Sequence, residues 1–400
     1  MVRVAFFHPD LGIGGAENLV VNSAVCLLKK FKHDVVIFTA HHDSSHCFKP
    51  TIDGTLRVKV FGDFLPIGST AGRLLFCFLR MLWVFVRVFI IVVLDGRRFD
   101  VAVNDQLALI NPLLKLVAKR VVFYGHFPDM LLCTDRKTHL KKAYRFAFDS
   151  LEKITTKTAD VILVNSKFTA EVFSQNFEIP LSRLVVLYPP VDVETIKIHK
   201  QCDLRQDLRE SITNDYFLSL NRYERKKNVE LCIKAYASLF SAVENRPALV
   251  IAGGYDDRIP ENVEYFGELR QLAADLGVDP VFLKSVNDDL RLSLLSGALA
   301  LCYTPSNEHF GIVPVEAMAC GTPVIALNSG GPRETVENGK TGYLVGEDTG
   351  CFAEAMGSVW RTPDQFDKAY MRDRVSDLFG LEGFAERLNS VIVDDRFKHE

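Results

Sequence analysis

Short runs of β-branched and aromatic residues alternate with helix-length amphipathic stretches along the whole chain. In the first half these runs are VRVAFF, DVVIFT, RVKVF, DVAV, RVVFY and DVILV, and in the second half they are YFLSLN, ALVIAG, PVFLKS, ALCYT and TPVIAL. Strands that alternate with helices in this way form parallel sheets covered by helices. The pattern therefore predicts an α/β protein built from doubly wound, Rossmann-like sheets.

The rhythm of strands and helices is interrupted by a polar, charge-rich stretch at Glu194–Thr213. A length of 400 residues suits two domains. We place the boundary between them in this stretch, because it interrupts the pattern of strands and helices. The expected division is a first domain at 1–190, a linker at 191–214, a second domain at 215–375 and a C-terminal helix at 376–400. Two such domains place the carboxyl ends of their strands across a cleft, where doubly wound folds bind ligands.

One predicted helix, Arg73–Asp95, is apolar enough to interact with a membrane. Its run Leu74–Leu94 would be about 31 Å long, which matches a bilayer core. Arg73, Arg80 and Arg87 are spaced seven residues apart and form one stripe on the helix. We favour a monotopic or re-entrant helix, with the arginines at headgroup phosphates and aromatic residues dipping below them. A helix buried within the domain and a true membrane span are the alternatives.

Composition and charge narrow the classes of partner. A net charge of −3 gives no reason to expect nucleic acid, because proteins that bind it carry a basic surplus or patch. The nine cysteines include no C-x-x-C pair, which is typical of reduced thiols in a cytosolic compartment. No Asp-x-Asp sequence occurs, so no metal clamp for a nucleotide diphosphate is evident. A polyanionic ligand must therefore be met by local charges.

The stretch YTPSNEHFGIVPVEAMACGTPV carries the strongest functional signal. A strand is expected to end near its start, Glu308 lies in a turn-rich loop, and Gly311 permits close approach of the backbone. Pro314 suits the first turn of a helix, whose free N–H groups would attract a diphosphate. Because Glu316 would repel phosphate, we interpret it as an acceptor of hydrogen bonds from sugar hydroxyls. The alternative is an acid that the helix dipole favours.

A second signal is the basic loop in LSLNRYERKKNVELCIKAY. Arg222 and Lys227 are two cations around a strand-to-helix connection, as a phosphate-binding turn requires. A solvated basic loop would have the same charges, so charge alone leaves both interpretations open.

A third signal, HPDLGIGGAENLV, places glycines before a predicted helix. It lacks the final glycine of the dinucleotide fingerprint and is weak when taken alone. In FYGHFPDML, His126 follows a strand end, where ligand contacts gather, although a lone histidine is often structural. The cluster HHDSSHC has no spacing diagnostic of a zinc site, and we interpret it as a polar loop.

Taken together, the GGAE loop, the Arg222 and Lys227 pair and the Glu308-x7-Glu316 motif resemble the retaining glycosyltransferases of family 4, which have the GT-B fold. The segments FFHPDLGIGGAENLV, GHFPDMLL, ADVILVNSKFTAEVF, NRYERKKN, AGGYDDR, YTPSNEHFGIVPVEAM and NSGGPRE resemble more specifically the alpha-1,3/1,6-mannosyltransferases of dolichol-linked oligosaccharide assembly. The resemblance extends from about Val2 to the 340s. It implies two facing Rossmann-like domains with the active site in the cleft between them, and a C-terminal helix that packs back on the first domain.

The resemblance also implies a reaction and a location. The reaction is retaining transfer of mannose from GDP-mannose to Man1GlcNAc2-diphosphodolichol, first by an alpha-1,3 and then by an alpha-1,6 linkage, for protein N-glycosylation. No cofactor is expected, and no metal motif is evident. The implied location is the cytosolic face of the endoplasmic reticulum membrane, in contact with the membrane surface and with other early mannosyltransferases as partners.

Carried over to this sequence, the resemblance assigns Arg222 and Lys227 to the donor diphosphate, Glu308 to the donor mannose and His126 to the transferring sugar. The implied donor-binding residues are Gly14, Gly15, Gly253, Phe310, Gly311, Ile312 and Glu316, the last of these at the ribose. On the acceptor or membrane side we expect Glu17, Asp105, Asp129, Arg73, Arg80 and Arg87.

The candidate residues favour one chemical course. A covalent intermediate needs a positioned carboxylate nucleophile, and no carboxylate of the first half stands out beyond Glu17, Asp105 and Asp129. We therefore favour a same-face displacement in which the departing diphosphate takes the proton of the acceptor hydroxyl. Arg222 and Lys227 would stabilise the charge that develops on the diphosphate.

Other functions remain as alternatives. A nucleotide-sugar epimerase of the same fold would not need the apolar helix, and a non-catalytic GT-B scaffold would be expected to lose some of the four charged donor-site residues. A nicotinamide dehydrogenase would need the complete glycine fingerprint. Another family 4 glycosyltransferase, with a different nucleotide sugar or lipid acceptor, would keep every motif.

Overall fold

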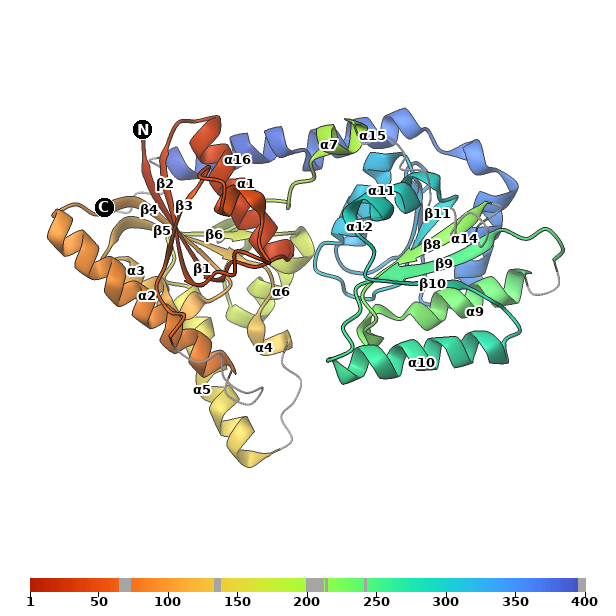
Figure 1. Ribbon diagram of the computed structural model, residues 1–400, viewed down its shortest axis with the longest axis horizontal. Coiled ribbons are helices and arrows are strands. Elements are labelled where there is room, and N and C mark those ends of the chain that lie inside the picture. Colours follow the sequence, from red (N-terminus) through yellow and green to blue (C-terminus); the bar gives the residue numbers. More distant parts are fainter. Residues whose placement is uncertain (65–72, 133–137, 199–211, 213–214, 241–242, 395–400) are drawn as a thin grey trace. The chain divides into compact units, whose positions relative to one another are not determined.

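The computed structural model describes residues 1–64, 73–132, 138–198, 212, 215–240 and 243–394 (Figure 1). The described residues form two compact units: Met1–Pro189 with Glu382–Glu400, and Pro190–Leu381. Of the linker predicted at 191–214, residues 199–211 and 213–214 lie outside the described part, as do residues 395–400 of the predicted C-terminal helix. The described start of the linker forms α7 (Val193–Ile198), which packs against helices of the second unit.

The first unit contains a seven-stranded parallel sheet in the order β3-β2-β1-β4-β5-β6-β7. Its strands are β1 (Arg3–Asp10), β2 (Asp34–His41), β3 (Arg57–Val60), β4 (Phe99–Asp105), β5 (Ala118–Gly125), β6 (Val161–Val164) and β7 (Leu184–Val186). The strand order reverses between β1 and β4, which are hydrogen-bonded neighbours. Ligands of doubly wound sheets bind at the carboxyl ends of the strands beside such a switch point.

Helices cover both faces of this sheet, because its inner strands are apolar throughout. In Figure 1, α1 and α16 lie on one face, and α2 and α5 lie on the other. The helices are α1 (Gly15–Lys29), α2 (Arg73–Asp95), α3 (Asn111–Leu114), α4 (Asp129–Leu132), α5 (His139–Thr156), α6 (Lys167–Phe177) and α16 (Leu381–Val393). Between α2 and the sheet, Phe7, Phe38, Val84 and Val88 form part of one buried cluster. Burial of each such side chain stabilises the fold by about 1.5–3 kcal/mol.

The second unit contains a six-stranded parallel sheet in the order β10-β9-β8-β11-β12-β13. Its strands are β8 (Tyr216–Leu220), β9 (Ala248–Gly253), β10 (Val281–Lys284), β11 (Ala300–Tyr303), β12 (Val324–Leu327) and β13 (Gly342–Val345). Its helices are α7, α9 (Val229–Phe240), α10 (Pro260–Asp275), α11 (Asp288–Gly297), α12 (Ile312–Cys320), α13 (Pro332–Thr335), α14 (Thr349–Arg361) and α15 (Lys368–Phe379). Figure 1 shows α9 and α10 on one face of the sheet and α11 and α12 on the other. Two doubly wound parallel sheets confirm the predicted fold class.

Arg80, in the middle of the arginine stripe of α2, faces inward, contrary to our prediction that it lies at lipid headgroups. Arg80 is 6% exposed, and its guanidinium donates to the carbonyl oxygens of Ala40 (3.3 Å) and Gly62 (3.4 Å). The guanidinium of Arg87 lies 5.3 Å from the ring centroid of Phe61. The side chain of Arg73 lies outside the described residues. Arg80 therefore contacts protein rather than lipid, whereas Arg87 is exposed beside Phe61.

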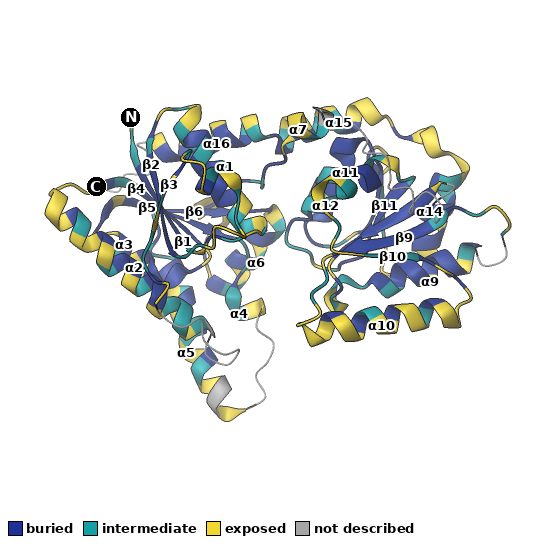
Figure 2. Cartoon of the chain, in the orientation of Figure 1, coloured by how far each residue is buried: buried dark blue, intermediate teal, exposed yellow. Residues whose placement is uncertain are grey.

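Another face of α2 exposes large apolar side chains. Leu75, Leu79, Trp83, Ile90 and Leu94 are 39%, 41%, 37%, 46% and 80% exposed. Figure 2 shows exposed positions recurring along this helix. The segment Leu74–Asp95 is long and apolar enough to cross a bilayer. An 18-residue stretch of it has a mean hydropathy of 2.5, and 33% of that stretch is buried. The prediction of a helix that buries its aromatic residues in lipid is thus wrong for Phe85, which is 8% exposed and belongs to the core.

The last described helix, α16, packs on the first unit. Lys30 of α1 pairs with Glu382 at 2.9 Å and with Glu386 at 3.2 Å. At the other end, the guanidinium of Arg120 in β5 donates to the carbonyl oxygens of Ile392 and Asp394, both at 2.6 Å. Because the final carbonyls of a helix have no partner within the helix, this buried cation stabilises the end of α16.

The substitution Arg120→Met tests this contact. Hydrogen bonds from a charged donor contribute about 1.5–3 kcal/mol each, so we expect amides of α16 to exchange with solvent roughly tenfold faster or more. Hydrogen exchange measured by mass spectrometry on peptides from 381–394 gives the rate. Arg98→Met, at an exposed arginine just before β4, is the control. Equal protection of α16 in both variants would contradict this role of Arg120.

Candidate functional site

In the second unit, two predicted site residues meet where β8 and β11 lie side by side. Lys227 ends a short 3-10 turn, Arg225–Lys227, that precedes α9, and Glu308 lies in the loop after β11. The Nζ atom of Lys227 forms an ion pair with the carboxylate of Glu308. The Thr304 hydroxyl donates to the carbonyl oxygen of Lys227 at 2.8 Å, which holds the two loops together. The structure thus joins the basic loop to the glutamate loop at the switch point of this sheet.

The charge of Glu308 is stabilised by its neighbours. Burial alone would raise the pKa of its carboxyl group, but the Lys227 ammonium and a hydrogen bond from Tyr303 outweigh burial and lower that pKa. Tyr303 itself is buried, and burial together with the Glu308 charge raises the pKa of its phenol well above the ordinary value. Glu308 is therefore a carboxylate at neutral pH, with a hydrogen-bond donor on two sides.

Two glycines shape the wall next to Glu308. Gly330 has a φ of +63°, and a Cβ atom there would lie 2.4 Å from the carbonyl oxygen of Glu308. The backbone N–H of Gly331 donates to that same oxygen at 2.7 Å, and a Cβ on Gly331 would lie 2.4 Å from the carbonyl oxygen of Phe310. The glutamate loop therefore rests directly on a glycine backbone, which fixes Glu308 and Phe310 without intervening side chains.

Arg222 follows β8 and remains largely open to solvent. Its side chain is 62% exposed, and its Nη1 atom lies 2.9 Å from Glu224. Gly253, at the end of β9, supports this loop: a Cβ atom there would lie 1.7 Å from the carbonyl oxygen of Asn221. Arg222 is thus placed by a close backbone contact, while its guanidinium stays accessible to a ligand.

The helix that follows Glu308 begins as predicted, with Gly311 at its N-cap and Ile312 as its first residue. Gly311 has a φ of +84°, and no side chain caps this helix end. Glu316 pairs with Arg291 of α11, a partner that the sequence did not indicate. Burial nevertheless raises the pKa of Glu316, and Arg291 offsets only part of that effect. The Glu316 carboxyl therefore ionises less readily than Glu308.

In the first unit, four side chains converge at the carboxyl ends of β1, β4 and β5. His8 lies in β1, and its Nδ1 atom is 2.9 Å from Asp105 at the end of β4. The other oxygen of Asp105 lies 2.7 Å from Nε2 of His126, one residue past β5. The Nε2 atom of His8 lies 3.5 Å from Glu17 of α1. Three residues that the sequence singled out separately are thus joined by His8.

Charge compensation governs this cluster. Burial by itself would lower the pKa of His8, but hydrogen bonds and charges of Asp105 and Glu17 outweigh it and raise that pKa to about 9. For Asp105, burial would raise the pKa, whereas His126 and His8 together lower it to about 2. At neutral pH the cluster therefore contains an imidazolium between two carboxylates.

The glycine pair lies beside this cluster. Gly14 is the N-cap of α1 in extended conformation, with no side-chain cap, and Gly15 is the first helical residue. A Cβ atom on Gly14 would lie 2.3 Å from a carboxylate oxygen of Glu17, so glycine leaves space for that carboxylate. Glu17 therefore lies against the helix end that we expected to contact the donor.

Asp129, the third predicted carboxylate, belongs to a different set of contacts. It begins α4 and pairs with Arg145 of α5 at 2.9 Å. The backbone N–H groups of Asp129 and Met130 donate to Glu152 at 2.7 and 3.1 Å. Burial, followed by the nearby charge of Asp129, raises the pKa of Glu152 to about 7 in spite of these bonds. Asp129 therefore ties α4 to α5.

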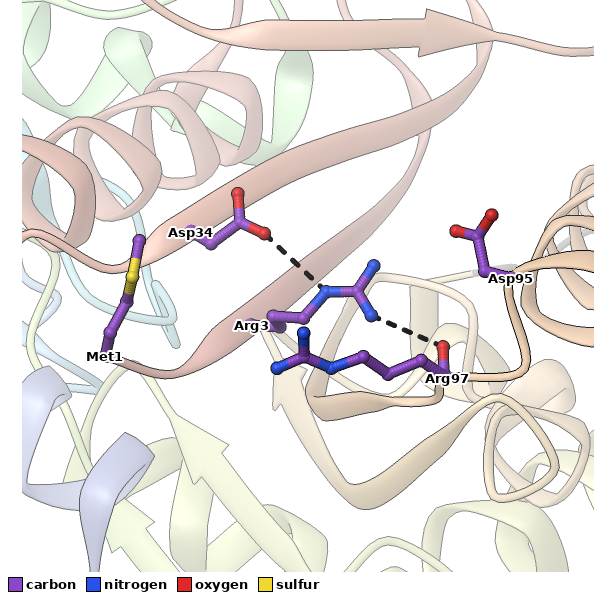
Figure 3. A pocket seen from close by; sticks show the side chains of 5 residues that line it. All are labelled: Met1, Arg3, Asp34, Asp95 and Arg97. Atoms are coloured by element: carbon purple, nitrogen blue, oxygen red, sulfur yellow. Dashed lines mark hydrogen bonds and ion pairs between the residues drawn. The ribbon is translucent and has the colours of Figure 1, made fainter.

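A polar cavity of about 500 Å³ lies at the opposite edge of the first sheet (Figure 3). It is lined by Met1, Arg3, Asp34, Asp95 and Arg97, at the amino ends of β1 and β2 and before β4. Arg3 pairs with Asp34 at 3.6 Å and donates to the carbonyl oxygen of Arg97 at 3.4 Å. Arg3 is thus already paired, and none of the candidate residues whose side chains are described lines this cavity. Within the described residues, no group of three or more His, Cys, Asp or Glu side chains is arranged to hold a metal ion.

The sequence pattern did not indicate two important partners, His8 and Arg291. His8 stands near the end of an apolar strand run, where a buried polar residue is the available signal, and Arg291 lies in an ordinary polar helix. Local patterns identify loops and helix ends, but they do not identify pairs that form between elements distant in sequence.

Two family models match the chain: "Glycosyltransferase Family 4" over residues 13–195, and "Glycosyl transferases group 1" over residues 201–365. The alpha-1,3/1,6-mannosyltransferase ALG2 of Rhizomucor pusillus is 42% identical over 98% of this chain and 92% of its own length. That of Mus musculus is 43% identical over 96% of this chain and 94% of its own.

A solved structure supports the same fold. Sucrose-phosphate synthase from Thermosynechococcus elongatus superposes with a TM-score of 0.75 at 19% identity, covering 98% of each chain. Such a low identity supports the fold alone. The family expected from the motifs is confirmed by the curated relatives, and the chain belongs to the alpha-1,3/1,6-mannosyltransferase family of glycosyltransferases.

Proposed function

We propose that this protein is a retaining mannosyltransferase of dolichol-linked oligosaccharide synthesis. It transfers mannose from GDP-mannose to Man1GlcNAc2-diphosphodolichol, first in an alpha-1,3 and then in an alpha-1,6 linkage. The names of the relatives support the activity and both linkages. The observation that carries the assignment is the Lys227 and Glu308 pair beside the exposed Arg222 at the switch point of the second sheet.

The two cations fit the departure of a nucleoside diphosphate. As the glycosidic bond breaks, negative charge develops on the diphosphate, and cations held in place beforehand stabilise that charge most effectively. Lys227 is held by Glu308 and by the backbone contact with Thr304. Arg222 has an accessible guanidinium that can bind phosphate oxygens in a bidentate manner. The diphosphate then accepts the proton of the attacking hydroxyl on the same face of the sugar.

Glu308 has a separate role in this proposal. As a carboxylate flanked by the Gly330 and Gly331 backbone, it can accept hydrogen bonds from hydroxyls of the donor mannose. Gly311 and Ile312 supply the first amides of α12 toward the same ligand. Glu316, whose pKa is raised by burial, would bind the ribose through a carboxyl group that Arg291 orients.

We further propose that the enzyme lies on the cytosolic face of the endoplasmic reticulum membrane and contacts the bilayer through α2 and α5. On α5, Phe146, Leu151 and Ile154 are 74%, 46% and 61% exposed. The two helices meet where the backbone N–H of Leu75 donates to the Tyr144 hydroxyl at 3.0 Å. A lipid-linked acceptor requires an enzyme at the membrane surface, and exposed apolar side chains on two adjoining helices suit partial insertion. Association with other early mannosyltransferases stays a prediction.

The donor and the linkages are tested by one reconstitution. The purified chain in liposomes is incubated with the mannosyl-chitobiose lipid and either GDP-mannose or UDP-N-acetylglucosamine, and the released glycans are sequenced. We expect extension by an alpha-1,3 and then an alpha-1,6 mannose with GDP-mannose alone. Transfer solely from the UDP sugar would exclude the proposed function.

The role of Lys227 is tested by Lys227→Ala with Lys226→Ala as the matched control, because Lys226 is 64% exposed and pairs with Glu224. We expect kcat to fall by about 100-fold or more in the first variant, since a charge-stabilising donor is lost, and to stay near normal in the second. Burial of Glu308 without its cation should also raise the carboxyl pKa, so the acid limb of kcat/KM moves to higher pH. Near-normal turnover of Lys227→Ala would contradict the assignment.

The membrane face is tested by the double substitution Trp83→Glu and Ile90→Glu. We expect co-flotation of the double variant with liposomes to fall by about tenfold or more. Each substitution removes an apolar side chain that would contact lipid and adds a carboxylate that is costly to move out of water. Val263→Glu in α10, at a residue of similar exposure (43%), is the control and should float as the unmodified chain does. If the double variant floats equally well, this face does not bind the bilayer.

A further inference from the structure

The groups that contact the two ring nitrogens of His8 determine its protonation state. Its two ring nitrogens face carboxylate oxygens, those of Asp105 at 2.9 Å and of Glu17 at 3.5 Å. A carboxylate accepts hydrogen bonds and donates none, whereas a neutral imidazole has one N–H group and one lone pair. A neutral His8 would therefore leave two carboxylates beside a ring that carries no compensating charge. A doubly protonated ring matches both neighbours.

We propose that His8 is a permanently protonated, buried imidazolium that positions His126 through Asp105. One carboxylate oxygen of Asp105 contacts His8, and the other lies 2.7 Å from Nε2 of His126. Because the carboxylate can only accept, the Nε2 atom of His126 carries a proton toward Asp105. The Nδ1 atom is then the ring nitrogen left for a sugar hydroxyl. This deepens the proposed function and rests on it as far as the sugar is concerned.

Burial isolates the central pair from solvent and leaves the two ends accessible. The side chains of His8 and Asp105 are 0% and 2% exposed, whereas those of Glu17 and His126 are 19% and 26% exposed. Buried charges carry a large desolvation cost, so such a set is stable only when every charge has a partner. Removal of His8 would take away the buried cation beside Asp105. The contact that orients the ring of His126 would then weaken.

The other groups that face His8 are consistent with a cation at this position. Glu17 from α1 and Asp105 from β4 contact His8, and Tyr124 of β5 lies beside His126, with ring centroids 4.9 Å apart. The Tyr124 hydroxyl donates to the carbonyl oxygen of Leu187 at 2.8 Å, and burial raises its pKa well above the ordinary value, so it adds no charge. Two carboxylates thus surround one imidazolium, and the shift of the His8 pKa to about 9 agrees with this geometry.

The direction of the pKa shift sets the pH range of the contact. The pKa of His8 is raised from 6.5 to about 9, so its stabilising contribution is fully present below about pH 6.5 and is lost as the pH rises through about 9. For Asp105, the lowered pKa of about 2 means that its contribution is present above its ordinary value of 3.8 and is lost as the pH falls through about 2. Between pH 4 and pH 8, His8 therefore stays protonated and Asp105 stays ionised, so the ion pair between them is kept.

The protonation states can be read directly by nitrogen NMR on the full chain with ¹⁵N in its histidine rings. We expect one ring, assigned to His8 by its slowly exchanging N–H protons, to stay doubly protonated from pH 6 to pH 8 and to begin losing its proton near pH 9. His126, assigned by the loss of its signals in His126→Gln, should carry its proton on Nε2. A neutral His8 at pH 7.5, or His126 with its proton on Nδ1, would overturn the proposal.

Turnover supplies the second measurement. In His8→Gln, we expect kcat with GDP-mannose to fall by about 10- to 100-fold, as for a misplaced reacting group, while KM for GDP-mannose changes less than about threefold because Arg222 and Lys227 are untouched. His33→Gln is the control, since His33 is also buried but contacts Asn389 at 2.8 Å. A drop in kcat with an unchanged His126 tautomer would refute positioning. If the unmodified chain fails to use GDP-mannose, the proposed function fails, and the NMR result alone decides the state of His8.

Discussion

The reversal of strand order within each parallel sheet is the constraint on which the two half-sites depend. In the first sheet β1 lies between β2 and β4, and in the second sheet β8 lies between β9 and β11. At such a reversal, the loops after the two neighbouring strands lead to helices on opposite faces of the sheet. A crevice therefore stays open at the carboxyl ends of these two strands. His8 and Asp105 come from the first of these edges, and Lys227 and Glu308 from the second. If the strands lay in the order of the sequence, β1 would not be next to β4, and β8 would not be next to β11. The residues of each half-site would then lie too far apart to touch.

Charge compensation then decides what each edge can do. Burial favours the neutral form of every carboxyl group, and a nearby cation opposes it. At Glu308 and Asp105 the cation prevails, so both are carboxylates with fixed donors beside them. At Glu316 burial prevails in spite of Arg291. The two acidic residues of the Glu308-x7-Glu316 motif therefore differ in how readily they ionise as well as in position. This difference suits Glu308 to accept hydroxyl hydrogen bonds more strongly than Glu316.

Local sequence signals were sufficient for much of this arrangement. Apolar runs predicted most of the strands, although β7 (Leu184–Val186) and β13, a short half-buried GYLV segment, were not among them. Gly311 and Pro314 indicated the start of α12, because backbone conformation and helix-end chemistry are encoded within a few residues. The partners His8 and Arg291 were not predictable in this way, since each pair joins residues that the chain separates and that only the tertiary fold brings together.

The helix α2 shows what periodicity can and cannot provide. A spacing of seven correctly places Arg80 and Arg87 toward one segment, but it does not tell whether that side of the helix meets lipid or protein. Burial of Arg80 is acceptable because backbone carbonyl oxygens of Ala40 and Gly62 accept its hydrogen bonds. The outward side keeps Leu79, Trp83 and Ile90 in water, which costs free energy in proportion to the apolar area exposed. A cover of lipid would remove that cost without disturbing the buried arginine, so the fold is compatible with shallow insertion and needs no crossing of the bilayer.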